Sequence, residues 1–390
     1  MKIAVVCDSF KGSLTSKDAC AAVKDGLLRC NKNFEVLSLP FADGGEGTSR
    51  CFYDILGGQL RKAAVHDPLL REITAEYTVL PDGTAVIDIA SASGLTLLKS
   101  SERDAVKVSS LGSGELICDA AEHGAKHIIL GLGGSATTDA GTGILYALGM
   151  RFFSDDGAEV LPDGQNMIRV KKIRRTENFE RFKDIKFTLA CDVTNPLCGE
   201  NGAAYVFSPQ KGASKNDVEL LDDGLRNIGE IFEKASGKKI INLPGAGAAG
   251  GIGGGLSAFL NCELQSGFDV LARAASLEDK IRRSDAVITG EGKTDRQTLF
   301  GKLPKRVSDI AEKFGVPCIL LSGDVENDIS AEKLGVCEIH KIKENGISLE
   351  HCMKNAASLL SERAFAIGKD SKIINKQYSR KQEKMRENER

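Results

Sequence analysis

"KIAVVCDSFKGSLTSKDACAAVKDGLLRCNKNFEVLSL" (residues 2–39) contains the alternation that decides the fold. The apolar run over residues 2–7 predicts a buried strand, and residues 34–39 predict a second one. Between them, residues 16–30 place apolar side chains on one face of a helix that begins with Ser and Asp. A strand, a helix and a strand in this order form a βαβ unit with two parallel strands.

The same alternation returns near the C-terminus. Strands are expected at residues 285–289, 316–323 and 336–342, and helices at residues 302–315 and 347–367. Short, continuous apolar strands between helices are typical of a parallel sheet that is covered on both faces. Both ends of the chain therefore predict one doubly wound, Rossmann- or flavodoxin-like α/β domain, built from residues 1–60 and 276–370.

The middle of the chain has a different pattern. Asp82-Gly83 lies between two alternating segments and predicts a β-hairpin, and strands follow at "HIILG" and "FTLACDV". We expect a second, mixed α/β domain at residues 61–275, inserted into the first. Residues 371–390 carry seven Lys or Arg and three Glu, which predicts a charged, frayed tail.

Composition excludes several classes of protein. The 52 basic and 54 acidic residues nearly balance, and no basic stripe with aromatic residues indicates nucleic-acid binding. The apolar run before Asp8 is too short for a signal peptide or a membrane span, so we expect a cytoplasmic protein without membrane contact. None of the 11 cysteines forms Cys-x-x-Cys, which favours reduced thiols. A homo-oligomer stays compatible with these residues.

Two glycine-containing loops follow the first two strands. "DSFKGSLTS" (8–16) supplies Asp8, Ser9 and Lys11 before a helix N-terminus, a combination that suits an anion. Its hydroxyls are also explained if Ser13 or Thr15 only caps the helix. "PFADGGEGTSR" (40–50) places Asp43 near Asp8 if the two strands are neighbours, although the loop is equally readable as a turn and a helix start.

The loop "LGLGGSATTDAGTG" (130–143) has two interpretations. Gly131-x-Gly133-x-x-Ala136, with Asp155 and Asp156 about twenty residues later, satisfies the looser dinucleotide fingerprint of an NAD-linked oxidoreductase. Its Thr137-Thr138-Asp139 run and its additional glycines are better suited to holding phosphate oxygens. The residues favour the phosphate loop.

A third charged loop, "ITGEGKTDRQTLFGK" (288–302), contains Gly292-Lys293-Thr294, the end of a P-loop. The motif also needs a glycine five positions before Gly292, where this chain has Val287, so the match fails. Its dense charges still predict a polyanionic ligand, with or without a metal. Asp192 ends another predicted strand, and the Gly/Ala run at 243–260 serves either close packing or ligand contact.

Taken together and in order, seven segments of the chain resemble the bacterial glycerate kinase family of the first type. They are "DSFKGSLTS", "FADGGEGT", "GLGGSATTDAGTG", "ACDVTNPLCG", "FSPQKGA", "PGAGAAGGIGGG" and "ITGEGKTDRQTLFGK", and the resemblance spans residues 1–368. Cys7 and Lys293 stand where many relatives have proline and arginine. The resemblance implies two α/β domains with the active site in the cleft between them. It also implies ATP- and Mg²⁺-dependent phosphorylation of D-glycerate, to 2-phosphoglycerate rather than 3-phosphoglycerate.

Under this resemblance the loops receive roles in phosphoryl transfer. Gly133, Gly134, Ser135, Thr137 and Glu291 are expected to bind the nucleotide, and Asp8, Ser9, Lys11 and Asp43 the substrate. Lys11 and Lys293 are expected to hold a phosphate or carboxylate, and Asp192 and Asp295 share metal ligation and acceptance of the hydroxyl proton. Two alternatives stay open, the NAD-linked oxidoreductase and a non-catalytic sensor of an acidic metabolite on the same fold.

Overall fold

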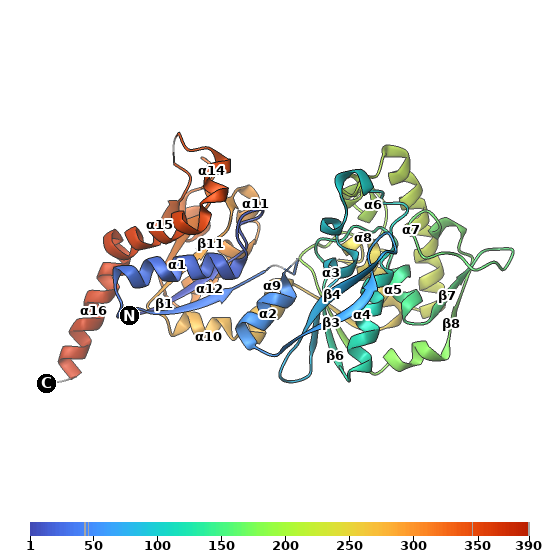
Figure 1. The fold of residues 1–390 in the computed structure, drawn as a ribbon, viewed down its shortest axis with the longest axis horizontal. Helices are drawn as coiled ribbons and strands as arrows, with labels where there is room; N and C mark the ends of the chain where they lie inside the picture. The colour runs from blue at the N-terminus through green and yellow to red at the C-terminus, as the bar shows by residue number, and fades with distance from the viewer. Residues whose placement is uncertain (43, 46, 345, 389–390) are drawn as a thin grey trace. The chain divides into compact units, whose positions relative to one another are not determined.

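The computed structural model describes residues 1–42, 44–45, 47–344 and 346–388, with side chains described to residue 380. The chain divides into two compact units (Figure 1). Unit 1 comprises Met1–Asp43 and Leu271–Arg390, and unit 2 comprises Gly44–Val270. The sequence places these borders after residues 60 and 275, so the first lies well before its expected position.

Unit 1 contains a five-stranded parallel sheet in the order β15-β13-β11-β1-β2. Its strands are β1 (Lys2–Cys7), β2 (Glu35–Pro40), β11 (Ala286–Gly290), β13 (Cys318–Ser322) and β15 (Glu338–Lys341). Ile3 of β1 pairs with Val36 of β2 and with Ala286 of β11. Counted along unit 1 alone, the order is 2-1-3-4-5, which is the flavodoxin-like arrangement.

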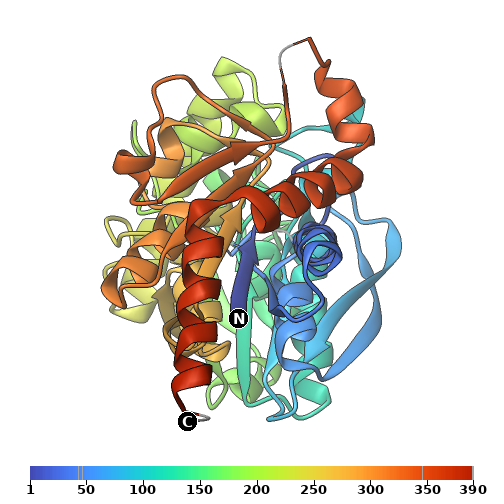
Figure 2. The ribbon, with the colours of Figure 1, turned by 90° about the vertical axis from the view of Figure 1, so that its left-hand side faces the viewer.

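Helices cover both faces of this sheet. After β1 and after β11 the chain moves in opposite directions along the sheet, so right-handed crossovers place α1 (Ser16–Cys30) and α12 (Leu303–Lys313) on opposite faces. Figures 1 and 2 show α15 (Ala356–Asp370) beside α1. The expected single helix at 347–367 is divided at Asn355 into α14 (Leu349–Lys354) and α15.

The C-terminal segment is helical where the sequence predicts a frayed tail. Helix α16 (Lys372–Asn388) turns away from the axis of α15 (Figure 2). Ile374 is fully buried in the unit 1 core, and the Tyr378 ring meets Phe34 edge-on with a centroid distance of 5.8 Å. The apolar stripe of Ile373, Ile374 and Tyr378 therefore anchors the first two turns despite the surrounding charges.

Unit 2 contains a six-stranded sheet in the order β10-β9-β6-β5-β4-β3. Its strands are β3 (Gln59–His66), β4 (Glu72–Val79), β5 (Ala85–Asp88), β6 (His127–Gly131), β9 (Lys186–Ala190) and β10 (Asn261–Gln265). The first four in spatial order are parallel, whereas β4 is antiparallel to both β5 and β3. Gly83 has φ 84° in the predicted hairpin between β4 and β5, which confirms that turn.

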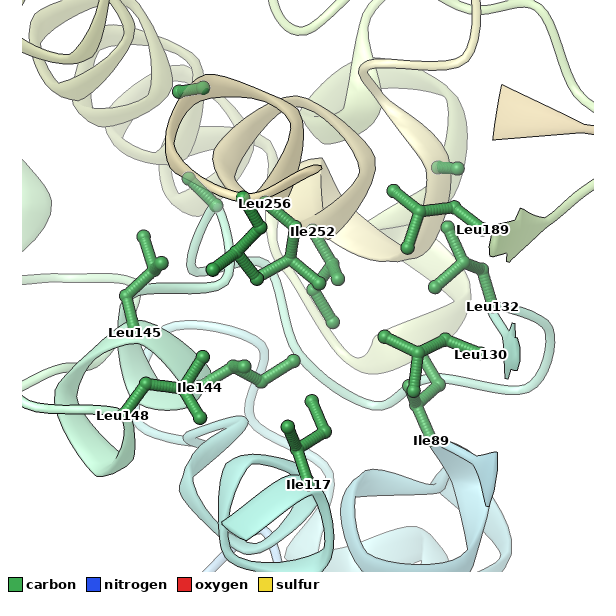
Figure 3. Close-up of a cluster of buried hydrophobic side chains, with 14 of the residues drawn as sticks. Ile89, Ile117, Leu130, Leu132, Ile144, Leu145, Leu148, Leu189, Ile252 and Leu256 are labelled. Atoms are coloured by element: carbon green, nitrogen blue, oxygen red, sulfur yellow. The ribbon is translucent and has the colours of Figure 1, made fainter. Parts of the chain in front are cut away.

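The core of unit 2 lies between this sheet and several helices. Figure 3 shows Leu130 and Leu189 of the sheet with Ile252 and Leu256 of α8 (Ala248–Phe259), beside side chains of α4 (Leu111–Glu122) and α5 (Thr142–Ala147). Among the described residues, the other α-helices and strands are α2 (Thr48–Leu56), α3 (Ala90–Ser93), β7 (Met150–Phe153), β8 (Lys172–Arg175), α6 (Ala203–Phe207), α7 (Lys215–Ser236), α9 (Gly267–Ala274), α10 (Leu277–Arg282), β12 (Lys293–Thr294), α11 (Arg296–Leu299), β14 (Asp324–Val325) and α13 (Ala331–Leu334). Within the described ranges, every helix is too short or too polar to cross a membrane.

Candidate active site

The candidate site of unit 1 lies where the strand order reverses, between β1 and β11. Open parallel sheets bind ligands at the carboxyl ends of the strands at such a switch point. The loops that follow these two strands touch, because a Cβ added at Gly292 would lie 3.2 Å from Phe10 Cα and 3.3 Å from Lys11 N. Two predicted loops, distant in sequence, are therefore brought together at the expected edge.

The loop after β1 is held mainly by backbone hydrogen bonds. Asp8 N–H donates to Gly290 O at 2.9 Å, and the Ser9 N–H donates to Asp8 Oδ1 at 2.6 Å. Thr15 caps α1 by accepting from Asp18 N–H at 3.1 Å, so this hydroxyl has the structural role that the sequence allowed. Lys11 is exposed, and its ammonium group is accessible to an anion.

Glu291 supplies a buried carboxyl group directly after β11. Only 6% of the residue is exposed, and its Oε1 accepts hydrogen bonds from Thr298 Oγ1 at 2.7 Å and Thr294 Oγ1 at 3.1 Å. Burial raises the pKa of Glu291 to about 7, and the negative charge of Asp8 adds to this effect. The two threonine bonds and the charge of Lys302 oppose the rise. This carboxyl group therefore titrates near neutrality.

A two-stranded ribbon fixes the rest of the loop after β11. Strands β12 and β14 pair in parallel, and a Cβ at Gly323 would lie 2.1 Å from Gly292 O. Thr294 Oγ1 also lies within hydrogen-bond distance of Ser322 Oγ, at 3.0 Å. Lys293 is exposed and pairs with Glu326 at 2.7 Å, so binding an anion would require it to share or exchange this partner.

Asp295 caps a short helix at the same edge. It is the N-cap residue of α11, and its Oδ1 accepts from Gln297 N–H at 2.9 Å. The Lys302 ammonium lies 3.5 Å from that oxygen. The predicted partner Asp43 lies outside the described residues, and so does its expected approach to Asp8.

The candidate site of unit 2 is the glycine loop that follows β6. A Cβ at Gly133 would lie 2.3 Å from Gly45 Cα, so the predicted loop at 44–45 packs directly on it. Gly134 O accepts from Leu95 N–H at 2.9 Å, and Ala136 N–H donates to Ser93 O at 2.8 Å. These bonds hold both flanks of Ser135.

The following residues are enclosed by the kinked start of α8. A Cβ at Gly250 would lie 2.0 Å from Thr137 O, which explains part of the Gly/Ala run by close packing. The Thr137 hydroxyl is buried and finds no hydrogen-bond partner among the described residues. Asp139 is fully buried, and burial raises its pKa although Ser110 donates to it through both its backbone N–H and its hydroxyl.

Lys211 joins this loop and was not among the predicted site residues. Its Nζ donates to Ser135 Oγ at 2.9 Å and to Thr137 O at 2.6 Å, and only 3% of the residue is exposed. Burial lowers the pKa of Lys211 to about 7, while Asp139 partly offsets this effect. The block "FSPQKGA" was a signal for this lysine, but its approach to Ser135 depends on tertiary packing.

Asp192 lies at the carboxyl edge of the unit 2 sheet. It is an exposed residue two positions after β9, the strand that neighbours β6. Leu132 N–H donates to Ala190 O at 3.1 Å, which ties the glycine loop to the end of β9. Asp192 and Asp295 belong to different compact units.

Magnesium is the metal that the predicted chemistry requires. Across residues 1–42, 44–45, 47–344 and 346–388, no three His, Cys, Asp or Glu side chains converge to hold a metal ion. Mg²⁺ commonly takes only one or two protein carboxylates and completes its shell with phosphate oxygens and water. A single carboxylate, such as Asp192 or Asp295, would be enough for an ion that is held mainly by the nucleotide.

The geometry does not favour the dinucleotide interpretation of the glycine loop. In a dinucleotide turn the helix begins within the glycine motif, whereas α5 begins only at Thr142, after an irregular segment. Asp156 accepts from Ser154 Oγ at 2.5 Å and from Ala158 N–H at 3.1 Å, as a surface turn requires. These local hydrogen bonds account for the position of the Asp156 carboxylate, so a contact with a nucleotide ribose is not needed to explain it.

A separate groove of about 500 Å³ lies between α1 and α15 in unit 1. Its polar groups satisfy one another, since Ser361 Oγ donates to Asp25 Oδ2 at 2.6 Å and accepts from Arg29 Nη1 at 3.1 Å. None of the predicted site residues lines it. We do not assign the groove to the site.

Known proteins resemble this chain over nearly its whole length. The model of the Glycerate kinase family matches residues 3–372. A glycerate kinase of Halalkalibacterium halodurans is 38% identical over 93% of this chain and 96% of its own length. The glycerate 2-kinase of Escherichia coli K12 is 41% identical over 84% of this chain and 87% of its own length.

A solved structure has the same fold. The crystal structure of a Salmonella typhimurium LT2 protein, provisionally named glycerate kinase 2, aligns with a TM-score of 0.84 at 35% identity. The alignment covers 95% of this chain and 97% of that one. The chain therefore belongs to the glycerate kinase family, a family of phosphotransferase enzymes.

Proposed function

We propose that this chain transfers the γ-phosphoryl group of ATP to the 2-hydroxyl of D-glycerate, yielding ADP and 2-phosphoglycerate. The observation that carries the proposal is the glycine loop after β6, in which a buried lysine is hydrogen-bonded to Ser135. The choice of the 2-hydroxyl is supported by the Escherichia coli relative, which is named a glycerate 2-kinase.

The loop of unit 2 is suited to the nucleotide. Phosphoryl transfer needs placement and charge neutralisation more than covalent chemistry by the protein. Gly134, Ser135 and Thr137 would place backbone N–H groups and hydroxyls against phosphate oxygens. The Gly133 N–H already donates to Gly44 O at 3.1 Å, so Gly133 would contribute only close approach of the backbone. In unit 1, we propose that Glu291, half-protonated near neutrality, contacts the nucleotide as a donor or an acceptor.

The loop after β1 is suited to the acid. The Lys11 ammonium would pair with the glycerate carboxylate, and Asp8, Ser9 and Asp43 would contact its hydroxyls. Lys293 would be a second cation for the ligand if its ammonium group contacts both Glu326 and the ligand. The location of the active site between the two domains stays a prediction, as does a cytoplasmic location.

The proton of the reacting hydroxyl needs an acceptor within hydrogen-bond reach. We propose Asp295 or Asp192 for this role, and the other as the protein ligand of magnesium. When bound with ATP, magnesium would neutralise charge on the phosphate oxygens. An Asp295 carboxylate that caps α11 is already oriented by Gln297 N–H, so it needs little reorganisation to accept a proton.

Direct chromatographic measurement of ADP tests this function. Purified protein with ATP, Mg²⁺ and D-glycerate should release ADP, and omission of D-glycerate should abolish that release. An oxidoreductase would instead bind NAD and need no Mg²⁺, and a sensor would bind D-glycerate without turnover. Protein that is folded by circular dichroism but releases no ADP would contradict the proposal.

A further inference from the structure

The environment of Lys211 points to a function beyond holding the fold together. The residue ends the 3-10 turn Pro209–Lys211, and its side chain enters the unit 2 interior to reach the glycine loop. Placing an ammonium group away from water is costly unless hydrogen bonds compensate. Here the amine donates both to the Ser135 hydroxyl and to the Thr137 carbonyl.

We infer that Lys211 is a positioning residue that aims the Ser135 hydroxyl hydrogen at a phosphate oxygen of the nucleotide. A serine hydroxyl has one hydrogen and two acceptor lone pairs. Because Lys211 Nζ occupies one lone pair of Ser135 Oγ, the O–H bond must point away from the amine. This inference rests on the proposed function, since it assigns the nucleotide as the acceptor.

Hydrogen bonds of the neighbouring residues restrict the backbone of Ser135. The backbone on both sides of it is bonded to the Ser93–Leu95 segment, through Ala136 N–H and Gly134 O. The carbonyl of Thr137, the second acceptor of Lys211, lies where a Cβ at Gly250 would clash at 2.0 Å. The backbone is thus fixed independently, and the lysine contributes chiefly the direction of one hydroxyl.

The two hydrogen bonds that Lys211 donates do not require a charged amine. Burial holds the pKa of Lys211 near 7, so ammonium and neutral amine coexist around neutral pH. The ammonium has three N–H donors and the neutral amine two, and two suffice for the bonds to Ser135 and Thr137. Lys211 can therefore keep both bonds on either side of its pKa, and the ammonium form, which has no acceptor, forces the Ser135 O–H to point elsewhere.

A double-mutant cycle separates positioning from simple structural support. Loss of one preorganised donor to reacting charge typically lowers turnover by about 10²–10³-fold. We expect Ser135→Ala and Lys211→Met each to lower kcat/KM for ATP by roughly tenfold or more, with KM for D-glycerate nearly unchanged. The double variant should be no more impaired than the worse single variant, because both changes remove the same hydrogen bond to phosphate. If the losses in kcat/KM of the two single variants multiply in the double variant, the inference is overturned.

Lys238→Met is the matched control. Lys238 Nζ also donates to carbonyl oxygens of unit 2, Ser257 O at 2.7 Å and Leu260 O at 3.2 Å, but it is exposed and bonds no residue of the glycine loop. We expect this variant to keep wild-type kcat/KM for ATP. A loss equal to that of Lys211→Met would show that any lysine bridge in unit 2 has the same effect, and would overturn the inference.

Ser135→Ala keeps the test decisive if Lys211→Met does not fold. In that variant Lys211 retains its bond to Thr137 O, so the melting temperature should change little. Normal kcat/KM for ATP in folded Ser135→Ala protein would overturn the inference even if wild-type protein phosphorylates D-glycerate. Inactive wild-type protein would instead remove the proposed function itself.

Discussion

Glu291 titrates near neutrality because the fold encloses its carboxyl group. The folded pKa of about 7 exceeds the unfolded value, so the folded protein binds more protons between these values. The stability that this group contributes is complete below about pH 4.5 and is lost as pH rises through about 7. The loss amounts to about 3 kcal/mol from a shift of this size.

Glu291→Gln should remove this pH dependence. Thermal unfolding at pH 5 and pH 8 should show the wild-type protein losing more stability at the higher pH than the variant does. The glutamine keeps an oxygen that accepts from Thr298, so packing changes little. An equal stability difference between the two proteins at both pH values would contradict burial as the cause of the raised pKa.

Asp295 combines a helix cap with a candidate catalytic carboxylate. Asp295→Ala should lower kcat by roughly a hundredfold or more, as loss of a positioned acid–base group does. It should also lose about 1 kcal/mol of cap stability, because it removes the acceptor for Gln297 N–H.

Asp295→Asn is the control for the cap. Asparagine caps helices as well as aspartate does but cannot take up the hydroxyl proton. The Asn variant should therefore match the wild-type melting temperature and still lose kcat. Near-normal turnover in the folded Asn variant would exclude Asp295 as the base, and would leave Asp192 for that role.

At the scale of residues, the sequence predicts which loops meet better than it predicts which side chains meet. Asp8, Lys11 and Glu291 follow strands, and the strand order alone brings their loops to one edge. Lys211 comes from an irregular segment far from Ser135 in the sequence, and no local periodicity indicates that its side chain turns inward.

The glycine loop after β6 depends on the kinked start of α8. Gly250 has φ 70° and packs against the Thr137 carbonyl. The shape of the glycine loop is therefore set by α8, an element more than a hundred residues away in the sequence. Gly250→Ala should destabilise the protein by about 2–5 kcal/mol, the sum of backbone strain and overpacking. It should also impair turnover, since it displaces the backbone beside Ser135.

Gly157→Ala is the control for backbone strain alone. Gly157 has φ 80° but faces open space, so we expect a cost of only about 1–2 kcal/mol and unchanged activity. Urea unfolding of both variants measures the difference. Equal destabilisation would mean that close packing on Thr137 contributes nothing.

Strands and capped helices are the elements that the sequence predicts well. Residues 2–7 and 16–30 match β1 and α1 at both ends, because an apolar run and a Thr cap define them locally. The break at Asn355 and the buried start of α16 were missed. Both depend on how apolar residues pack in the core of unit 1, which the local sequence does not specify.

At the scale of the whole molecule, each of the two units contains a hydrophobic cluster of its own. One cluster contains buried residues from Ala63 to Leu260. Another contains buried residues from Ile3 to Val36 and from Ala286 to Ile374. Unit 2 is continuous in sequence, and a fragment of residues 44–270 is within the usual size of one domain.

We predict that this fragment folds on its own and has no kinase activity. It should unfold cooperatively on heating, and Leu256→Ala should destabilise it by about 2–5 kcal/mol, as in the full chain. The activity should be absent because the fragment lacks Lys11, Glu291 and Asp295, which we propose to contact the substrates. A fragment without a cooperative transition would contradict the independence of the two cores.

Phosphorus NMR of the completed reaction tests the central claim most directly. A phosphate on the secondary 2-oxygen of glycerate couples to one neighbouring proton, so the proton-coupled spectrum should show a new doublet as ATP converts to ADP. A phosphate on the primary 3-oxygen would give a triplet. Either a triplet or unchanged ATP in the presence of folded protein, Mg²⁺ and D-glycerate would contradict the account.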